Sequence, residues 1–291
     1  MISTRVREAQ LESIRFSSSV AAIGTLRCPA ESGYFRGEQL TDNYVVAFPQ
    51  APLWIRQDRG RAFVATAALA TMYNRAQRFE RRAITADGDT AEWFAVDEEI
   101  AREIVARVDR RAAESPAPLQ FTHVAVGPAL YRAQRLVSRN LHCDEPGETE
   151  ERAIAIFADV VALSYQSHGM LAHESTLDAT PSNMARIDLV ERAKSVLGAS
   201  CFENLALREI ARRCETSVYH LCRTFRAHTG QTLHGFRRDL RLRASLELLP
   251  DHRGSLSALA QHLGFSSHAH FSAAFKTQFG LAPAQWVRAI R

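Results

Sequence analysis

The feature that most constrains this sequence is a repeat near its carboxyl end, where one helix-turn-helix pattern occurs twice. The first copy runs from Leu207 to Gly230 and the second from Leu256 to Gly280. Four matched pairs share one 50-residue step: Ser217 and Ser267, Leu221 and Phe271, Phe225 and Phe275, and Gly230 and Gly280. Only the stretch before the second helix differs, being one residue longer in the second copy. The repeat predicts two similar helical units on one rigid body.

Capping residues within each copy support this interpretation. Ser217 and Ser267 can each accept a hydrogen bond from an otherwise unpaired N–H, and the glycine that ends each copy suits the left-handed conformation that closes a helix. Ser255 is a matching cap for the front helix of the second copy, but Ala206 stands at that place in the first. A missing cap costs about 1 kcal/mol. We therefore expect the front helix of the first copy to be the less stable one.

Further motifs follow one another in this part of the sequence: HLCRTFR at 220–226, TG at 229–230, RLR at 241–243, LGFSS at 263–267 and FGLAP at 279–283. With these motifs, the sequence from about Arg186 to Arg291 resembles the DNA-binding domain of AraC/XylS-family transcription regulators. The resemblance implies sequence-specific binding to double-stranded DNA. It implies no enzymatic activity, no catalytic residue and no cofactor.

Length and charge predict a second, different domain. The 291 residues, 46% hydrophobic and 23% charged, exceed what one hydrophobic core usually serves. From Ala185 onward, 16 basic and 8 acidic residues give +8, whereas the remaining 20 basic and 24 acidic residues give −4. A basic carboxyl-terminal part beside an acidic remainder fits a module that binds a polyanion. An uneven but inert surface is the alternative.

The expected fold is α+β with two domains. An amino-terminal small β-barrel or sandwich with helices is expected over residues 1–168, a linker over 169–184, and an all-α domain over 185–291. The all-α domain holds two helix-turn-helix units joined by a linker helix from about Leu233 to Leu249. In that helix leucines should anchor the core and four arginines should stay polar, with Arg241 as the candidate for an internal ion pair.

Short β-rich runs separated by turn signals characterise residues 44–96. The candidate strands are residues 44–48, 52–56, 68–73, 79–84 and 90–95, with a tight turn at 87–89. By pattern alone this part resembles the cupin-like sensor domain of many AraC/XylS regulators. No histidine precedes His123, so a histidine-rich metal site on these strands is excluded and no metal is expected.

A bound effector would therefore be recognised by shape, aromatic rings and a few polar groups. The candidate lining residues are Trp54, Arg56, Tyr73 and Trp93, with Arg81 and Arg82 as further candidates. Each could instead be a packing aromatic or a solvated arginine.

Helical periodicity follows over 97–113, 129–141 and 148–167, with a further strand expected over 120–126. The last of these helices could pack on the barrel or form a dimer interface. Members of the resembling family commonly dimerise through helices placed there, so a homodimer is expected, and RNA polymerase is a further candidate partner.

The cellular compartment is expected to be the cytoplasm. No run is long and apolar enough to cross a membrane, no membrane partner is expected, and the first residues lack the apolar core of a secretory signal. Five cysteines without a C-x-x-C pair are expected to be reduced thiols. A redox or metal sensor built on Cys28 and Cys143 is the alternative. The cysteines are Cys28, Cys143, Cys201, Cys214 and Cys222.

The faces of the two second helices predict the DNA contacts. With Leu221 and Phe225 buried, the first should present Arg223 to guanine, in a bidentate contact worth about 1–3 kcal/mol, and Arg226 to phosphate. A surface salt bridge is the alternative for Arg223. The second helix has Ala273 at the place of Arg223, so fewer base contacts are expected there. The predicted DNA-binding residues are Ser217, Tyr219, Cys222, Arg223, Arg226, Ser267, His268, His270, Ser272 and Lys276.

Together these features predict an effector-responsive, sequence-specific transcription regulator. One alternative is a constitutive DNA-binding regulator whose amino-terminal domain only dimerises or binds a protein partner. A pocket of small-molecule size with convergent polar groups would argue against that alternative, and a filled barrel interior would favour it. A second alternative, an alkyl-acceptor repair enzyme with a related DNA-binding part, needs a zinc-bound cysteine cluster or a Pro-Cys-His motif, and the sequence has neither.

Overall fold

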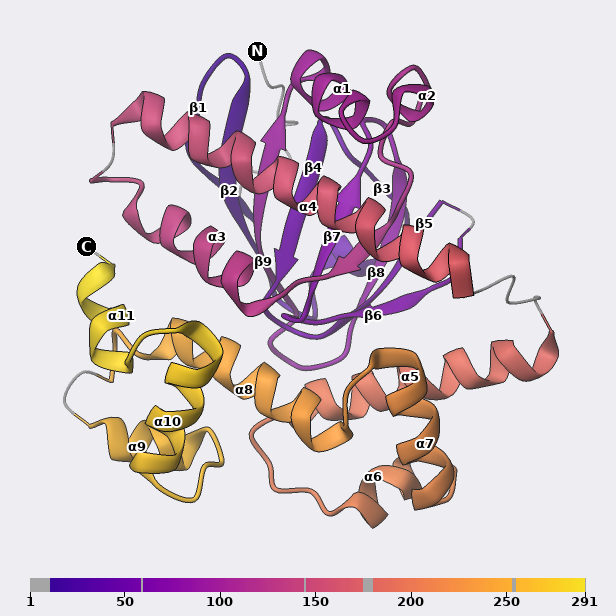
Figure 1. Cartoon of the computed structure of the whole chain (residues 1–291), viewed down its shortest axis with the longest axis vertical. Helices are drawn as coiled ribbons and strands as arrows, with labels where there is room; N and C mark the ends of the chain where they lie inside the picture. The colour runs from indigo at the N-terminus through magenta and orange to yellow at the C-terminus, as the bar shows by residue number, and fades with distance from the viewer. Residues whose placement is uncertain (1–10, 59, 144, 175–179, 253–254, 291) are drawn as a thin grey trace. The chain divides into compact units, whose positions relative to one another are not determined.

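The computed structural model describes residues 11–58, 60–143, 145–174, 180–252 and 255–290. The chain divides into two compact units, Met1–His173 and Glu174–Ile290. Among the described residues, the strands and the helices α1 to α4 belong to the first unit, and the second unit is helical (Figure 1). The two-domain α+β organisation predicted from the sequence is confirmed.

The amino-terminal unit contains two antiparallel sheets instead of one closed barrel, so the sandwich alternative is the one observed. The six-stranded sheet has the order β1 (Glu12–Ser17), β2 (Ala21–Cys28), β9 (Asp89–Val96), β4 (Tyr44–Pro49), β7 (Leu69–Tyr73), β10 (His123–Ala125). The four-stranded sheet has the order β3 (Gln39–Leu40), β8 (Arg78–Ala83), β5 (Leu53–Gln57), β6 (Phe63–Ala65). A short 3-10 helix, η1 (Gly33–Phe35), lies in the connection from β2 to β3.

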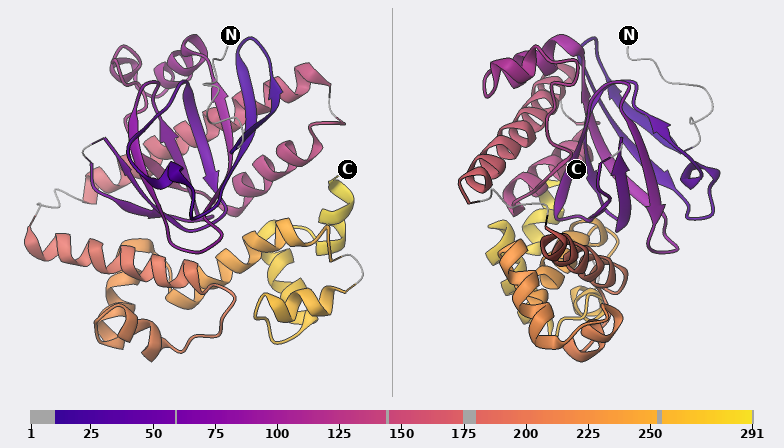
Figure 2. Two further views of the ribbon diagram at one scale, coloured as in Figure 1. Left: turned by 180° about the vertical axis from the view of Figure 1, so that it is seen from behind. Right: turned by 90° about the vertical axis from the view of Figure 1, so that its right-hand side faces the viewer.

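Helices cover one face of the strands in this unit. The helices α3 (Pro128–Asn140) and α4 (Pro146–Glu174) lie across that face, as two views at right angles show (Figures 1 and 2). A buried ion pair joins Arg135 of α3 to Glu92 of β9. The single helix predicted over 97–113 is instead two helices, α1 (Glu98–Ala106) and α2 (Arg110–Ala113), because Asp109 caps a new helix start by accepting from the Ala112 N–H at 3.0 Å.

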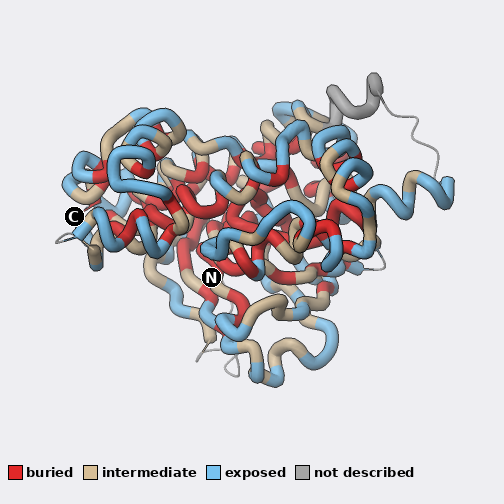
Figure 3. Tube along the Cα trace, turned by 90° about the horizontal axis from the view of Figure 1, so that it is seen from below, coloured by how far each residue is buried: buried red, intermediate tan, exposed pale blue. Residues whose placement is uncertain are grey.

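The carboxyl-terminal unit contains the predicted repeat. Its helices are α5 (Pro181–Ala199), α6 (Leu207–Arg213), α7 (Val218–Thr229), α8 (Leu233–Leu248), α9 (Leu256–His262), α10 (His268–Phe279) and α11 (Pro283–Ala289). The pairs α6–α7 and α9–α10 are the two helix-turn-helix units, and α8 runs from one to the other (Figure 1). Buried and exposed positions alternate along these amphipathic helices (Figure 3).

The expected caps are present in both units. Ser217 accepts from the His220 N–H at 3.2 Å, and Ser267 accepts from the His270 N–H at 3.1 Å. Gly230 and Gly280 end α7 and α10 in the left-handed conformation, with φ of 69° and 76°. Ser255 caps α9, whereas the start of α6 at Ala206 has no side-chain cap.

The segment 169–184 is more helical than its composition predicted. Residues 169–174 continue α4, and α5 begins at Pro181, where Thr180 accepts from the Asn183 N–H at 3.3 Å. Proline at the first helical position favours such a start, so the turn signals in this segment include a helix N-terminus. The predicted linker residues 175–179 lie outside the described residues. Across the described ranges, no helix has both the length and the apolar character needed to span a bilayer.

Candidate nucleic-acid interface and ligand cavity

The helix α7 has one buried and one exposed face. Leu221 and Phe225 are 1% and 0% exposed, which places Arg223 and Arg226 on the solvent side. Tyr219 is 74% exposed, an unusual exposure for a large aromatic side chain. Cys222 is partly buried between these faces, and the Ser217 hydroxyl is already used as the cap. The exposed face therefore offers two guanidinium groups and one phenol.

Several arginines of this unit are engaged with the protein, whereas the two of α7 have no acidic partner among the described residues. Arg212 and Arg213 both contact Glu209 at 2.8 Å, and Arg243 contacts Asp239 at 2.9 Å. Within the described part of the chain, neither Arg223 nor Arg226 has an acidic partner. The surface salt bridge considered for Arg223 is absent from this structure. Two unpaired guanidinium groups on an exposed helix face are suited to guanine edges and phosphates.

The helix α10 presents a different surface. Phe271, Phe275 and Phe279 form its buried side, with ring centroids 5.8 and 4.8 Å apart along the row. On the exposed side, His268 Nε2 lies 3.1 Å from the Ser272 hydroxyl. His270 Nδ1 lies 3.1 Å from the Ser266 hydroxyl, and Ser267 is the cap.

The exposed face of α10 carries little charge. Ala273 occupies the place of Arg223 and is exposed, and Lys276 is exposed at the place of Arg226. The second surface thus offers hydroxyl and imidazole groups with one lysine, in contrast to the two arginines of α7.

The helix α8 holds both units through a buried core. Leu240, Leu242, Leu246 and Leu249 are buried as predicted, and Trp286 of α11 donates its indole N–H to the Leu246 carbonyl at 3.1 Å. The expected polar exposure of the arginines is wrong for two of them. Arg243 is 2% exposed and makes the internal ion pair, with Asp239, that was predicted for Arg241. Arg241 is 5% exposed and bonds to carbonyl oxygens instead.

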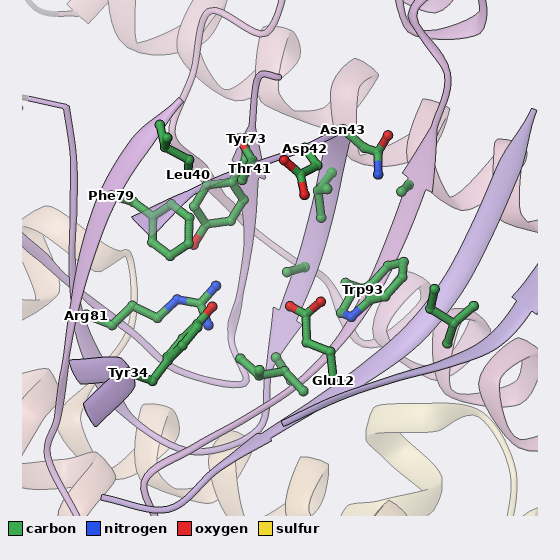
Figure 4. A pocket seen from close by; sticks show the side chains of 16 residues that line it. Glu12, Tyr34, Leu40, Thr41, Asp42, Asn43, Tyr73, Phe79, Arg81 and Trp93 are labelled. Carbon is green, nitrogen blue, oxygen red and sulfur yellow. The ribbon is translucent and has the colours of Figure 1, made fainter. Parts of the chain in front are cut away.

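A cavity of about 90 Å³ lies in the amino-terminal unit, lined from both sheets (Figure 4). This volume has room for on the order of six water molecules. Aromatic rings and charged groups of both signs line it. The lining residues that carry rings or charges are Glu12, Tyr34, Asp42, Tyr73, Phe79, Arg81 and Trp93. The interior is therefore not filled.

Two of the four predicted effector-binding residues line this cavity. Tyr73 and Trp93 do, whereas Trp54 and Arg56 are not among its lining residues. The guanidinium carbon of Arg82 lies 5.6 Å from the Trp54 ring, and Arg56 contacts Glu80 at 2.7 Å. The alternating burial along β5 explains why Trp54 and Arg56 do not line the cavity. Leu53 and Ile55 are buried, and their neighbours point to the other face of the sheet.

Arg81 is the charged centre of the cavity. Its Nη1 lies 2.6 Å from Asp89 Oδ2, and its guanidinium carbon lies 4.6 Å from the Phe79 ring centroid. Burial raises the pKa of Asp89, and Arg81 partly offsets that rise. Burial would lower the pKa of Arg81, but Tyr34 and then Asp89 raise it above the ordinary value. Arg81 is therefore a permanent cation held against the cavity wall.

Trp93 forms another wall and has an unused donor. A side chain at Gly24 would meet the Trp93 ring at 2.2 Å, so glycine is what lets the indole lie against β2. The buried Nε1 of Trp93 and Nε of Arg81 have no hydrogen-bond partner among the described residues. Glu12 and Tyr34 complete the cavity and were missed from the sequence, because β1, β2 and η1 were not predicted there.

None of the five cysteines, which all lie within the described ranges, forms a disulfide. Burial raises the pKa of Cys28 and of Cys214. A raised thiol pKa reduces the reactive thiolate fraction, which weakens the case for a redox sensor that uses Cys28.

The geometry of the second unit defines a class of protein: two capped recognition helices on one helical core, in a double helix-turn-helix domain. Comparison with known proteins agrees, since residues 210–289 match the family described as a helix-turn-helix domain. Over this domain the chain is similar to AraC-type regulators, as its sequence motifs predicted.

Curated relatives match parts of the chain. The HTH-type transcriptional activator RhaR of Klebsiella pneumoniae is 26% identical over 157 residues, which cover 53% of each chain. The uncharacterized HTH-type transcriptional regulator YidL of Escherichia coli is 34% identical over 94 residues, 32% of each chain. The Msm operon regulatory protein of Streptococcus mutans is 26% identical over 110 residues, 38% of this chain and 40% of its own. The chain thus spans about a third to a half of the length of the curated relatives it matches.

Solved structures show weaker likeness. An apo ToxT variant from Vibrio cholerae is 12% identical, covers 95% of this chain and 100% of that chain, and has a TM-score of 0.39. A transcriptional regulator with an AraC-type DNA-binding domain from Chromobacterium violaceum is 27% identical and covers 34% of this chain and 89% of that chain, with a TM-score of 0.33.

Proposed function

We propose that this protein is a sequence-specific DNA-binding transcription regulator that acts in the cytoplasm and responds to a small-molecule effector. The observation that carries the DNA-binding part is the exposed face of α7, where Arg223 and Arg226 have no acidic partner within the described residues. Helix-turn-helix proteins insert such a face into the major groove, where arginine distinguishes guanine by two hydrogen bonds. The formal charge of +8 from residue 185 onward supports attraction to the duplex.

The test is selection of duplexes from a random library by the full chain, followed by a titration of the recovered duplex by fluorescence anisotropy. We expect specific binding at least about a thousandfold tighter than binding to scrambled DNA. Equal affinity for the recovered and the scrambled duplex would overturn the proposal.

The cavity of the first unit supports the effector-responsive version over a constitutive regulator. Its buried donors, Trp93 Nε1 and Arg81 Nε, are suited to an effector that presents oxygen acceptors, and its rings are suited to a flat or apolar body. We propose that such a molecule binds here and changes which DNA sites the second unit occupies.

A metabolite screen by thermal shift tests this part. An oxygen-bearing compound that binds should stabilise the wild type, and Trp93→Phe should reduce that stabilisation because it keeps a ring but removes the donor. Trp54→Phe, outside the cavity, is the matched control and should leave the stabilisation unchanged. A compound whose effect is unchanged in Trp93→Phe does not use this cavity.

We also propose that the chain forms a homodimer through a groove between α1 and α4. The groove is lined by apolar residues with charges of both signs at its edge, and Val108 within it is 43% exposed. A two-fold interface can pair such a surface with itself. Light scattering after size exclusion should give twice the chain mass, and Ala158→Arg should give the monomer. RNA polymerase remains a proposed partner of the DNA-bound state.

A further inference from the structure

Arg241, in the middle of α8, is the buried group with the most unusual set of partners. Its side chain donates four hydrogen bonds, none to a carboxylate. Nε bonds to the Cys201 carbonyl at 2.5 Å and Nη1 to the Gly264 carbonyl at 2.9 Å. Nη2 bonds to the Glu203 carbonyl at 2.9 Å and to Asn204 Oδ1 at 3.0 Å. A planar guanidinium with several fixed donors holds its acceptors in definite directions.

These acceptors belong to different helix-turn-helix units. Residues 201–204 lie between α5 and α6 and lead into the first unit, whereas Gly264 is in the turn between α9 and α10 of the second. Two further contacts strengthen the junction. Arg237, one turn earlier on α8, donates to the Leu205 carbonyl at 2.9 Å, and the rings of Phe202 and His262 lie 5.2 Å apart.

The turn of the second unit is shaped around this guanidinium. A Cβ at Gly264 would lie 2.7 Å from the guanidinium carbon of Arg241, and Gly264 has φ of 73°. The matching residue of the first unit, Glu215, has φ of 54° and carries a side chain. Close approach to Arg241 is thus an additional reason for glycine in the second turn, beyond its backbone conformation.

Four oxygen acceptors face this guanidinium, and an apolar side chain at this place would leave them without a donor. Burial, and next the nearby charge of Arg237, lower the pKa of Arg241. The group stays charged at neutral pH nonetheless, because an arginine in a protein does not lose its proton. Placing a charge among neutral oxygens has a desolvation cost that these four bonds offset.

We propose that Arg241 is a positioning residue that fixes the second recognition helix relative to the first, and so sets the separation of the two DNA half-sites that the protein accepts. This inference rests on the proposed DNA-binding function. B-DNA repeats every ~34 Å along its axis, so two helices on one body reach successive major-groove segments only at one spacing. Fixing that spacing raises the effective concentration of the second helix at its half-site once the first is bound.

The experiment compares Arg241→Met with Arg238→Met in the full chain. Arg238 is exposed on the same helix, so both variants remove one positive charge from α8. The probes are the duplex recovered by selection, the same duplex with each half scrambled in turn, and the same duplex with two base pairs inserted between its halves. Circular dichroism melting establishes that each variant is folded at the assay temperature.

We expect Arg241→Met to bind the intact duplex at least about tenfold more weakly than the wild type. Its affinity for the better single half should change no more than that of Arg238→Met. The penalty for the two-base-pair insertion should also fall severalfold in Arg241→Met and stay unchanged in Arg238→Met. A folded Arg241→Met with the wild-type insertion penalty would overturn the proposal.

If Arg241→Met is unfolded, the insertion penalty is measured with Arg241→Lys instead. Lysine keeps the charge but cannot reach all four acceptors at once, so the penalty should again fall, and a wild-type penalty would overturn the proposal. Failure of the proposed function is distinguishable, because the wild type would then bind no selected duplex specifically.

Discussion

The two helix-turn-helix units share one scaffold but differ in where their chemistry lies. The first has unpaired arginines on α7, no cap on α6 and a non-glycine residue in its left-handed turn. The second has capped helices, a glycine turn pressed against Arg241 and a row of three buried phenylalanines. Local stability and the groups predicted to contact DNA are therefore concentrated in different copies of one repeat. The difference suggests that the first unit selects the sequence while the second anchors the complex.

The largest expected effect tests this division directly. Arg223→Ala should weaken binding to the selected duplex by about 1–3 kcal/mol and remove discrimination at one guanine. The matched change Ala273→Ser in the second unit should alter affinity by less than about twofold, because it removes no contact. Anisotropy titrations against duplexes substituted at each base pair measure both. Equal losses from the two variants would refute the asymmetry.

The next effect concerns the two turns. Gly264→Ala should destabilise the fold by roughly 2 kcal/mol, because it adds a left-handed alanine and a methyl group 2.7 Å from the guanidinium of Arg241. Glu215→Ala in the first turn should be close to neutral, since a side chain already occupies that conformation. Chemical denaturation at 25 °C gives both values. Similar losses of unfolding free energy in the two variants would show that the contact with Arg241 adds nothing to the requirement for glycine in the second turn.

A smaller effect is expected at the starts of the front helices. Ser255→Ala removes the cap of α9 and should cost about 1 kcal/mol, whereas Ala206→Ser should stabilise α6 by a similar or smaller amount. Amide hydrogen exchange in the first turn of each helix can measure the two changes. Unchanged protection of α6 in Ala206→Ser would mean that this helix is held by its packing alone.

The smallest effect depends on pH and is confined to the first unit. Hydrogen bonds from Arg212, and then from Arg213, lower the pKa of Glu209 from 4.5 to about 2. A lowered carboxyl pKa contributes stability above the ordinary value that is lost as the pH falls through about 2. Glu209 is only partly buried and both arginines are exposed, so solvent screens the interaction and we expect a small change. A carboxyl NMR titration should place its midpoint well below that of the same group in the Arg212→Ala, Arg213→Ala double variant.

The sequence predicted the second unit in more detail than the first because its signals are local. Caps, glycine ends and buried faces follow from spacing within a single helix, as with Ser217 and Gly230. Arg241 bonds to acceptors up to 40 residues away, which no local pattern could have predicted. Arg243 pairs with Asp239 four residues earlier, a helical spacing that the sequence did offer.

The candidate cavity shows the same limit. Tyr73 and Trp93 could be proposed from their type, and Trp54 could have been excluded because its neighbours Leu53 and Ile55 are apolar. Glu12 could not be placed, because it reaches the cavity through the pairing of β1 with β2 across a register shift. The strand β2 is buried on both faces, and so lacks the alternation that reveals a strand.

The burial of Trp286 gives the molecule an optical reporter of its own. The sequence has three tryptophans, and Trp54 and Trp93 both belong to the amino-terminal unit. Replacing those two with phenylalanine leaves a single emitter, fully enclosed in the core that closes the second helix-turn-helix pair. Its emission will shift to longer wavelength when that core opens to water. Opening of the core of the second unit can then be followed in a titration with DNA, because the first helix-turn-helix unit contains no tryptophan.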